Sequence, residues 1–516
     1  MPPGIRRTAR RETLARRVFR GTGIRGRMRL TSSGGMTRET QLDHGRWKRM
    51  RLGRWLIAGV VVLASPALVP AAAQAPSASL AGSDGLNDSY FPQDGNGGYD
   101  VAHYDVTLGY DPADHQLTGS TRIDASATQP LTSFNLDYSG PPVRAVRVNN
   151  APAGFEWQKP HELVVHPALP LLPGLPFTVT VDYAGTAPDT RGEGWTYAPT
   201  GGVFAAGQPH SASTWYPLND SPRDKATFTL HTTVPAEWEV VSGGVRVRDE
   251  VRDGFRTVSW EQRHPVIGYL TTVAIDRFEY LEQRRANGTP LLSAFAPGAE
   301  DLRQYEEKLP QVLDFTESLY GPYPFDTGGG IFLSVDIPFS LETQTRPTYA
   351  AWADLNTVVH ETAHQWWGDS VSVESWSDIC LNECIASYTA DYLWPERTEG
   401  ADVDAEYRRT VREMLAKPKF WAVPLEDPGP EKMFTSVYYR GPLFMHALRK
   451  QLGDDVFFAA LREFVTVHAY GNASMRDFRD FVQSTSPTDL TGFFDAWLRG
   501  TTPPPEQYLY PGSLRG

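Results

Sequence analysis

Two histidines one helical turn apart, with a glutamate between them, are the residues of this chain best suited to metal chemistry. They lie in the run His360-Glu361-Thr362-Ala363-His364. If this run is helical, both imidazoles project from one face and can reach a single zinc ion. Glu361 then lies about 100° round the helix, where it can touch a metal-bound water without being a ligand. The spacing favours a hydrolytic metal centre over a surface helix with two incidental histidines.

A carboxylate further along the chain supplies the third expected ligand. Eighteen residues separate His364 from Glu383, which lies in a second predicted helix at 379–393. A carboxylate from a neighbouring antiparallel helix gives a His2Glu donor set with one position left for water, whose pKa zinc lowers towards neutrality. Structural zinc sites instead close with four protein ligands. We therefore expect one Zn²⁺ per chain, held by His360, His364 and Glu383, and hydrolytic chemistry.

Hydropathy patterns predict which elements position these residues. From 97 to 290, apolar residues recur at every second position, as in Phe177, Val179, Val181 and Tyr183, which is typical of antiparallel strands. From 291 to 500 the period becomes helical. Helices are predicted at 354–367, 379–393, 402–416, 442–452, 454–467, 474–484 and 490–498. We predict an α+β multidomain protein, with an N-terminal β domain, a mostly α catalytic domain and a Pro-rich tail at 501–516.

The first 75 residues have the parts of an export signal. Arg54 precedes an apolar run from Trp55 to Ala64, and small-residue cleavage sites follow at 71–75. Translation from Met50 would give a signal peptide of normal proportions, and 76–96 resembles a linker. We expect a secreted protein. The alternative is an anchor at 55–75, which would be the chain's contact with a membrane.

Charge separates this leader from the rest of the chain. Residues 1–75 contain 16 of the 49 Lys and Arg but 3 of the 61 Asp and Glu, so residues 76–516 carry a net charge of about −25. An acidic body argues against nucleic acid as a partner, because phosphate binding needs a basic face. Two cysteines exclude a disulfide-built scaffold.

At residues 358–388 (VVHETAHQWWGDSVSVESWSDICLNECIASY) the sequence resembles the zinc aminopeptidases of the aminopeptidase N and leukotriene hydrolase kind. Phe339-Ser340-Leu341-Glu342-Thr343-Gln344 stands where that family has Gly-Ala-Met-Glu-Asn, and Tyr438-Tyr439-Arg440-Gly441 matches its Tyr-x-Lys-Gly segment. The resemblance implies a β saddle followed by a thermolysin-like domain. It also implies a short form without the helical C-terminal domain of many relatives, hence a more open site.

The resemblance also implies roles for individual residues. Glu361 is the expected general base and proton shuttle. Tyr438 is expected to donate a hydrogen bond to the developing oxyanion. Glu342 is expected to hold the α-ammonium of the substrate, although a surface carboxylate beside Arg346 is the plainer alternative. Gln208, before Trp215-Tyr216-Pro217, is the candidate for a second amine-binding group, against a structural turn residue.

Cys380 and Cys384 stand where the family commonly has Trp and Gly, on either side of Glu383. We expect two buried thiols, with an intrahelical disulfide as the alternative in an exported protein. Phe339 and Thr343 depart from the amine-binding motif, so the space beside the bound peptide must differ.

These observations predict a zinc aminopeptidase that removes N-terminal residues from short peptides with a free N-terminus. A zinc endopeptidase of thermolysin type is the alternative with the same chemistry, and it would be indifferent to N-terminal acetylation. A non-catalytic peptide-binding module on the same fold is the alternative from another class. Loss of Glu361, Tyr438 or a ligand would favour that module, and all of them are present.

Overall fold

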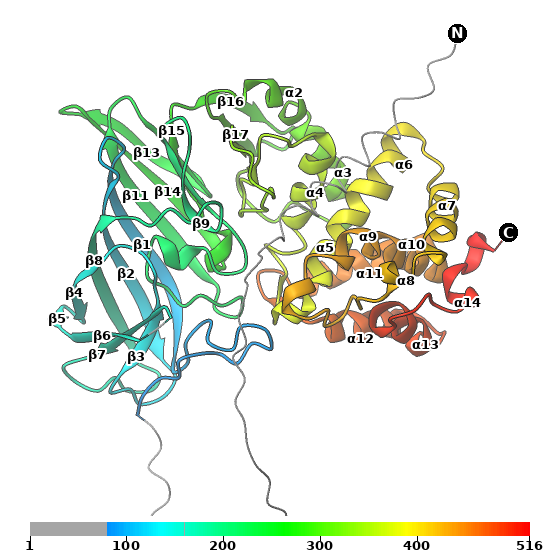
Figure 1. Cartoon of the computed structure of the whole chain (residues 1–516), viewed down its shortest axis with the longest axis horizontal. Helices are drawn as coiled ribbons and strands as arrows, with labels where there is room; N and C mark the ends of the chain where they lie inside the picture. Colours follow the sequence, from blue (N-terminus) through cyan, green and yellow to red (C-terminus); the bar gives the residue numbers. More distant parts are fainter. Residues whose placement is uncertain (1–79, 159, 516) are drawn as a thin grey trace, which may run out of the picture. The chain divides into compact units, whose positions relative to one another are not determined.

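An eight-stranded sheet forms the largest part of the N-terminal half. The computed structural model, drawn in Figure 1, describes residues 80–158 and 160–515. In sheet order the strands are β13 (Val245–Arg252), β14 (Phe255–Val266), β11 (Ala226–Pro235), β1 (Tyr99–Asp111), β2 (Gln116–Ala127), β8 (Pro176–Thr186), β4 (Val143–Val148) and β5 (Ala151–Pro152). Neighbouring strands are antiparallel except β1 and β11. Val106 and Leu108 of β1 are fully buried, as expected for one face of a half-buried strand.

Three smaller sheets accompany the large one, and two of them carry loops with candidate site residues. The first contains β3 (Phe134–Asp137), β7 (Glu162–His166) and β6 (Gly154–Gln158), and the second contains β12 (Glu239–Ser242), β15 (Val273–Asp276), β10 (Val203–Ala206) and β9 (Gly194–Tyr197). The third contains β16 (Glu279–Arg284), β17 (Pro290–Phe295), β18 (Ile331–Phe332) and β19 (Thr348–Tyr349). β18 and β19 bracket the loop that contains Glu342.

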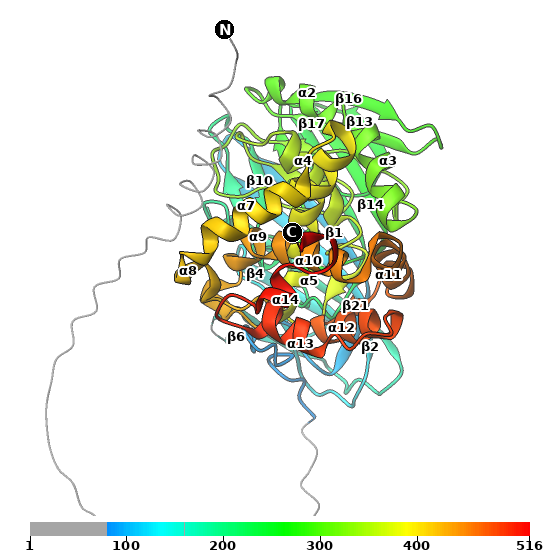
Figure 2. The same ribbon diagram turned by 90° about the vertical axis from the view of Figure 1, so that its right-hand side faces the viewer.

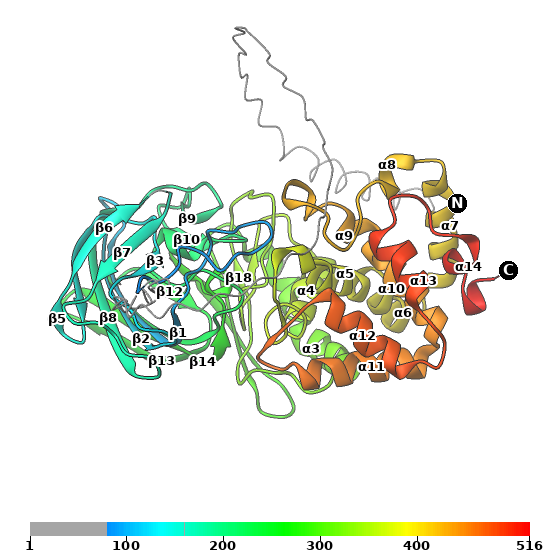
Figure 3. The ribbon, with the colours of Figure 1, turned by 90° about the horizontal axis from the view of Figure 1, so that it is seen from below.

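Helices dominate from residue 303 onwards. They are α2 (Arg303–Glu306), α3 (Leu309–Tyr320), α4 (Leu355–His364), α5 (Cys380–Tyr388), α6 (Trp394–Glu399), α7 (Val403–Leu415), α8 (Pro418–Trp421), α9 (Ser436–Tyr439), α10 (Gly441–Leu452), α11 (Asp454–Val467), α12 (Met475–Thr485), α13 (Thr491–Phe494) and α14 (Glu506–Leu509). Figure 3 shows α5 to α14 gathered beside one another on the right and the large sheet on the left, and Figure 2 looks onto the helices with that sheet behind them. Each helical stretch predicted between 354 and 498 contains a helix, and the expected α+β fold class is confirmed.

Residues 80–98, here called the N-terminal strap, correct the expectation of a linker at 76–96. Asp88 Oδ2 accepts a hydrogen bond from Trp376 N at 3.0 Å, and the Tyr90 hydroxyl donates to Asp427 Oδ1 at 2.8 Å. Asn96 is fully buried. Small polar residues are common in linkers, but the same side chains can satisfy turn and loop backbone groups in a packed segment. The strap therefore ties the β part to the helical part.

The Pro-rich tail expected at 501–516 is also packed where it is described. Leu509 and Leu514 are buried, and the Tyr407 hydroxyl donates to Leu509 O at 2.6 Å. The Pro-rich composition did not predict this packing, because a few apolar residues suffice to anchor a short segment on α7 and α10. The expected leader at 1–75 lies outside the described residues. Among the described residues, no helix has both the length and the apolar character needed to cross a bilayer.

Candidate active site

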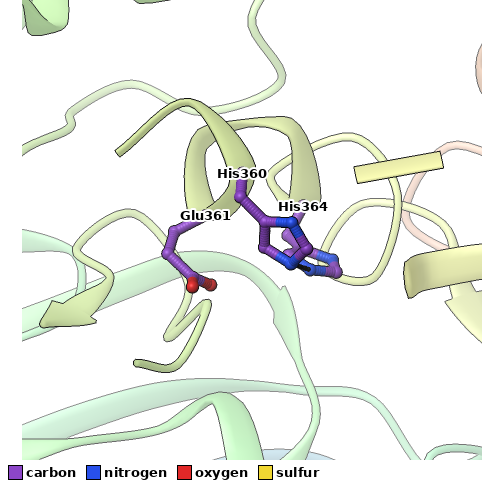
Figure 4. A group of neighbouring side chains, drawn as sticks. All are labelled: His360, Glu361 and His364. Carbon is purple, nitrogen blue, oxygen red and sulfur yellow. Dashed lines mark hydrogen bonds between the residues drawn. The ribbon is translucent and has the colours of Figure 1, made fainter. Parts of the chain in front are cut away.

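Helix α4 places the two histidines on one face. Asp354 caps its N-terminus by accepting a hydrogen bond from Thr357 N, and the Thr357 hydroxyl oxygen accepts one from Asp354 N, so the helix begins in a fixed register. The Nε2 atoms of His360 and His364 lie 3.1 Å apart. Figure 4 shows both rings on the same side of the helix, with Glu361 leaving it beside them. The two histidines therefore lie one helical turn apart on α4, as the sequence predicts.

Helix α5 brings Glu383 to the same point. Its Oε2 atom lies 3.3 Å from His360 Nε2 and 3.5 Å from His364 Nε2. Donor atoms bound tetrahedrally to zinc at its usual bond lengths are separated by about 3.3 Å, which the three observed distances match. Glu383 is 2% exposed, and its Oε2 receives no hydrogen bond from residues 80–158 or 160–515. An unpartnered, buried carboxylate oxygen between two imidazole nitrogens fits a zinc ion.

A hydrogen bond from Nδ1, the ring nitrogen that faces away from Glu383, fixes the orientation of His364. Its Nδ1 lies 2.9 Å from Trp367 O, so Nδ1 is the donor and the lone pair of Nε2 faces Glu383. This outer hydrogen bond prepares the ring as a metal ligand.

Glu361 lies close to the histidines without being one of the three converging groups. One of its carboxylate oxygens falls within 4.8 Å of nitrogens of His360 and His364. Its side chain is buried, and burial raises its pKa to about 7. A carboxylate in this position can accept a proton from a water held between the ligands.

Glu342, which is near enough to His364 and Glu383 to interact with them electrostatically, is held by two donors. Its Oε1 accepts a hydrogen bond from Gln208 Nε2 at 3.2 Å and another from the Tyr269 hydroxyl at 2.9 Å. Glu342 is 2% exposed, and burial raises its pKa. The structure therefore brings together the two residues that the resemblance assigned to the amine of the substrate. Arg346, the partner in the plainer alternative, turns away and donates to the backbone oxygens of Ser242 and Gly244.

Tyr438 reaches the metal-binding face from α9. Its ring centroid lies 6.2 Å from that of His360. Burial and the surrounding carboxylates raise the pKa of Tyr438 well above its usual range, so its hydroxyl keeps the proton it would donate. Arg440, two residues on, fixes α9 by donating to Trp497 O at 2.6 Å. Of the seven site residues chosen from the sequence, His360, His364 and Glu383 thus converge, Glu361 and Tyr438 lie close to the histidines, and Gln208 and Glu342 are hydrogen-bonded to each other.

Two family models match the chain in succession. The model of the peptidase M1 N-terminal domain matches residues 101–270, and that of the peptidase family M1 domain matches residues 336–497. The chain belongs to peptidase family M1.

Relatives of this M1 peptidase include much longer proteins. Endoplasmic reticulum aminopeptidase 1 of Homo sapiens is 24% identical over 75% of this chain and 46% of its own length. Aminopeptidase N of Lactococcus lactis is 23% identical over 77% of this chain and 50% of its own. The chain therefore spans about half the length of these curated relatives.

Solved structures of similar length also match this M1 peptidase. An M1 zinc metallopeptidase from Deinococcus radiodurans is 29% identical, with a TM-score of 0.75, over 82% of this chain and 98% of that one. A mutant of that protein bound to a Tyr-Ser-Ala substrate is 29% identical, with a TM-score of 0.74, over 82% of this chain and 99% of the other. The shared fold includes both the β part and the helical part.

Cys380 and Cys384 of the M1 peptidase form a disulfide, which corrects the expectation of two buried thiols. The bond spans one turn of α5, and Glu383 lies within that turn. Spacing alone allowed either state, because residues four apart in a helix are within bonding range.

Two polar side chains around Glu342 were missed from the sequence. Tyr269 lies 73 residues before Glu342, and no local pattern pointed to it. Gln365 receives a hydrogen bond from Thr345 N at 2.8 Å and thereby fixes the loop of Glu342 to the end of α4. Its position directly after His364, in a run of buried residues, was the available signal.

Proposed function

We propose that this M1 peptidase is a zinc aminopeptidase that acts on short peptides with a free N-terminus. The observation that carries the proposal is the Glu342 carboxylate, buried beside the His360, His364 and Glu383 set and oriented by Gln208 and Tyr269. A fixed negative group next to the hydrolytic centre suits an α-ammonium group one residue from the scissile bond.

Each residue of the site has a task in this reaction. Zinc, when bound, polarises a water molecule and the scissile carbonyl. Glu361 takes the proton of the attacking water on its carboxylate and passes it to the leaving amine. Tyr438 donates its hydroxyl proton in a hydrogen bond to the oxyanion as the carbonyl carbon becomes tetrahedral. Glu342 and the Gln208 amide oxygen bind the α-ammonium, which fixes where the chain is cut.

A comparison of free and N-acetylated peptides tests the proposal. The full chain is assayed on a panel of aminoacyl chromogenic amides and on one tripeptide with and without an acetyl group, before and after chelation and Zn²⁺ readdition. We expect activity that needs metal and is lost on acetylation. Equal cleavage of both tripeptides would favour the endopeptidase alternative, and absence of any metal-dependent cleavage would favour a peptide-binding module.

We also propose that the protein is exported, with residues 50–75 as a cleaved signal peptide. The Cys380–Cys384 disulfide supports this, because disulfides persist in oxidising compartments. Retention of residues 55–75 as a membrane anchor is the alternative.

A further inference from the structure

A second cluster of ligating side chains lies in the β part, outside the zinc site. It borders a cavity of about 390 Å³, whose lining includes Asp94, Asp137, His161, Gln208, His210 and Asp220. The cluster joins β3, the start of β7, the N-terminal strap and the loop that carries Gln208. None of these residues except Gln208 has a task in the proposed reaction.

Asp137, His161 and Glu162 form the centre of this cluster. His161 Nε2 lies 3.2 Å from Asp137 Oδ1, 3.7 Å from Glu162 Oε1 and 3.8 Å from Asp94 Oδ1. One potential ligand atom from each of Asp137, His161 and Glu162 lies within 4.8 Å of the others. Ligands that share one ion at about 2.0–2.2 Å are separated by about 3–4.4 Å, so these atoms are close to coordinating positions.

The carboxylate oxygens of the cluster are buried and short of partners. Asp137 is 1% exposed and Glu162 2% exposed. Apart from these His161 contacts, Asp137 Oδ1, both carboxylate oxygens of Glu162 and Asp220 Oδ2 receive no hydrogen bond from the part of the chain that the structure describes. Buried, unpartnered carboxylates are expensive, and native proteins compensate them by pairing or by a bound ion.

Strand register makes the need for a cation stronger. Asp137 of β3 and Glu162 of β7 stand directly opposite each other, an arrangement in which like charges are destabilising. Among the described residues, Asp94, Asp137 and Glu162 form ion pairs with histidines and with no Lys or Arg. One of these, His210, is committed to Asp94 at 2.8 Å, which leaves His161 alone between Asp137 and Glu162.

We propose that Asp137, His161 and Glu162 form a second metal site, which takes a first-row divalent cation such as Zn²⁺ or Mn²⁺. The imidazole selects against Mg²⁺ and Ca²⁺, and the carboxylates bring enough negative charge to hold a divalent ion. His161 Nε2 also lies 3.4 Å from Gln93 O, a weak contact that metal binding would replace. Asp94 is close enough to add a fourth oxygen.

An ion at this site would brace the loop of Gln208. His210 follows Gln208 by two residues and holds Asp94 of the strap, while Asp94 faces His161. The cation would thus connect β3 and β7 to that loop. The consequence for substrate binding rests on the proposed aminopeptidase function, but metal occupancy does not.

Counting bound metal tests the proposal without an activity assay. The full chain is equilibrated with excess Zn²⁺ or, separately, Mn²⁺, desalted and analysed for metal per chain. We expect about two equivalents of Zn²⁺ in the wild type and about one in His161→Gln and Glu162→Gln. The matched control is His166→Gln, which changes an exposed histidine of the same strand and should keep both.

The His360→Ala variant lacks a ligand of the first zinc site and tests the proposed second site with its own residues unchanged. We expect it to retain about one equivalent of Zn²⁺, which disappears when His161→Gln is added, and to melt at a higher temperature with metal than without. The proposal is overturned if the wild type holds only about one equivalent, if His360→Ala holds none, or if the second equivalent survives both His161→Gln and Glu162→Gln. These outcomes do not depend on whether peptides are cleaved.

Discussion

Gln208 and Glu342 are 134 residues apart, and a hydrogen bond of 3.2 Å joins the side-chain amide of the first to the carboxylate of the second. One residue belongs to the β part and the other to the loop between β18 and β19. The proposed amine-binding end of the site is therefore shared between the two parts of the chain. In the proposed reaction, substrate recognition depends on how these parts are packed, whereas hydrolysis depends on residues of α4, α5 and α9.

Neutralising Glu342 should weaken recognition of the free N-terminus. Glu342→Gln removes a charge-assisted contact worth on the order of 2–3 kcal/mol, so kcat/KM should fall roughly 30- to 150-fold. The wild type should cleave an N-acetylated peptide about as poorly as the variant cleaves the free one. Arg346→Gln is not a suitable control because Arg346 is buried, whereas the exposed Glu374→Gln should leave kcat/KM unchanged. If Glu342→Gln is as active as the wild type, Glu342 does not bind the amine.

Different mutations should abolish metal binding and proton transfer separately. His360→Ala and His364→Ala remove a ligand from a three-residue set and should abolish peptidase activity and Zn²⁺ binding at this site. Glu361→Gln removes the proton acceptor while leaving the three converging ligand atoms, so it should retain Zn²⁺ and lose turnover. Metal content and kcat measured on the same preparations check this. Full turnover in Glu361→Gln would exclude Glu361 as the base.

Tyr438→Phe should act on kcat rather than on KM. The hydroxyl is expected to form its hydrogen bond only as the oxyanion develops, so its loss raises the barrier without weakening the ground-state complex. A decrease in kcat of about 10²-fold or more is expected, with KM changed far less. The neighbouring Tyr439→Phe, at an exposed position, is the matched control. A rise in KM at constant kcat would show that Tyr438 binds substrate instead.

Glu306 should make stability depend on pH. Burial raises its pKa from 4.5 to about 8. One oxygen accepts a hydrogen bond from Ser293, and the other has no hydrogen-bond partner among the residues that the structure describes. The folded chain therefore holds this proton more tightly than the unfolded chain, and the resulting stabilisation is lost as the pH rises from about 4.5 to about 8.

Glu306→Gln cannot ionise and keeps an acceptor for Ser293, so it should gain stability relative to the wild type as the pH rises, by on the order of 3–5 kcal/mol in total. Melting temperatures of the wild type and of Glu306→Gln at pH 5, 6.5 and 8 measure this difference in stability. The exposed neighbour Glu307→Gln is the matched control. A stability difference between Glu306→Gln and the wild type that does not change with pH would contradict the prediction.

The mature protein should begin near Pro76, after translation from near Met50. The reason is the apolar run from Trp55 to Ala64, followed by small-residue cleavage sites at 71–75. N-terminal sequencing of secreted protein is the measurement. A mature N-terminus upstream of Trp55, or a product that stays in the membrane fraction, would favour the anchor.

The sequence by itself determined what local periodicity can encode. The spacing of His360 and His364 fixes their common face, because any α-helix places residues four apart one turn from each other. Alternating apolar residues likewise predicted β1 and β8, and the longer helices follow their apolar stripes. The position of Glu383 came from its place in a second helix and from the family resemblance.

Tertiary structure alone decided the relationships between distant segments. No pattern indicated that Tyr269 would meet Glu342, or that Asp137 would stand opposite Glu162, because strand pairing and loop packing carry no periodic mark along the chain. The composition of residues 80–96 fitted a linker until Asp88 and Tyr90 were seen bonded to the helical part. Local sequence specifies which elements form, whereas the free energy of burying their surfaces together decides which side chains meet.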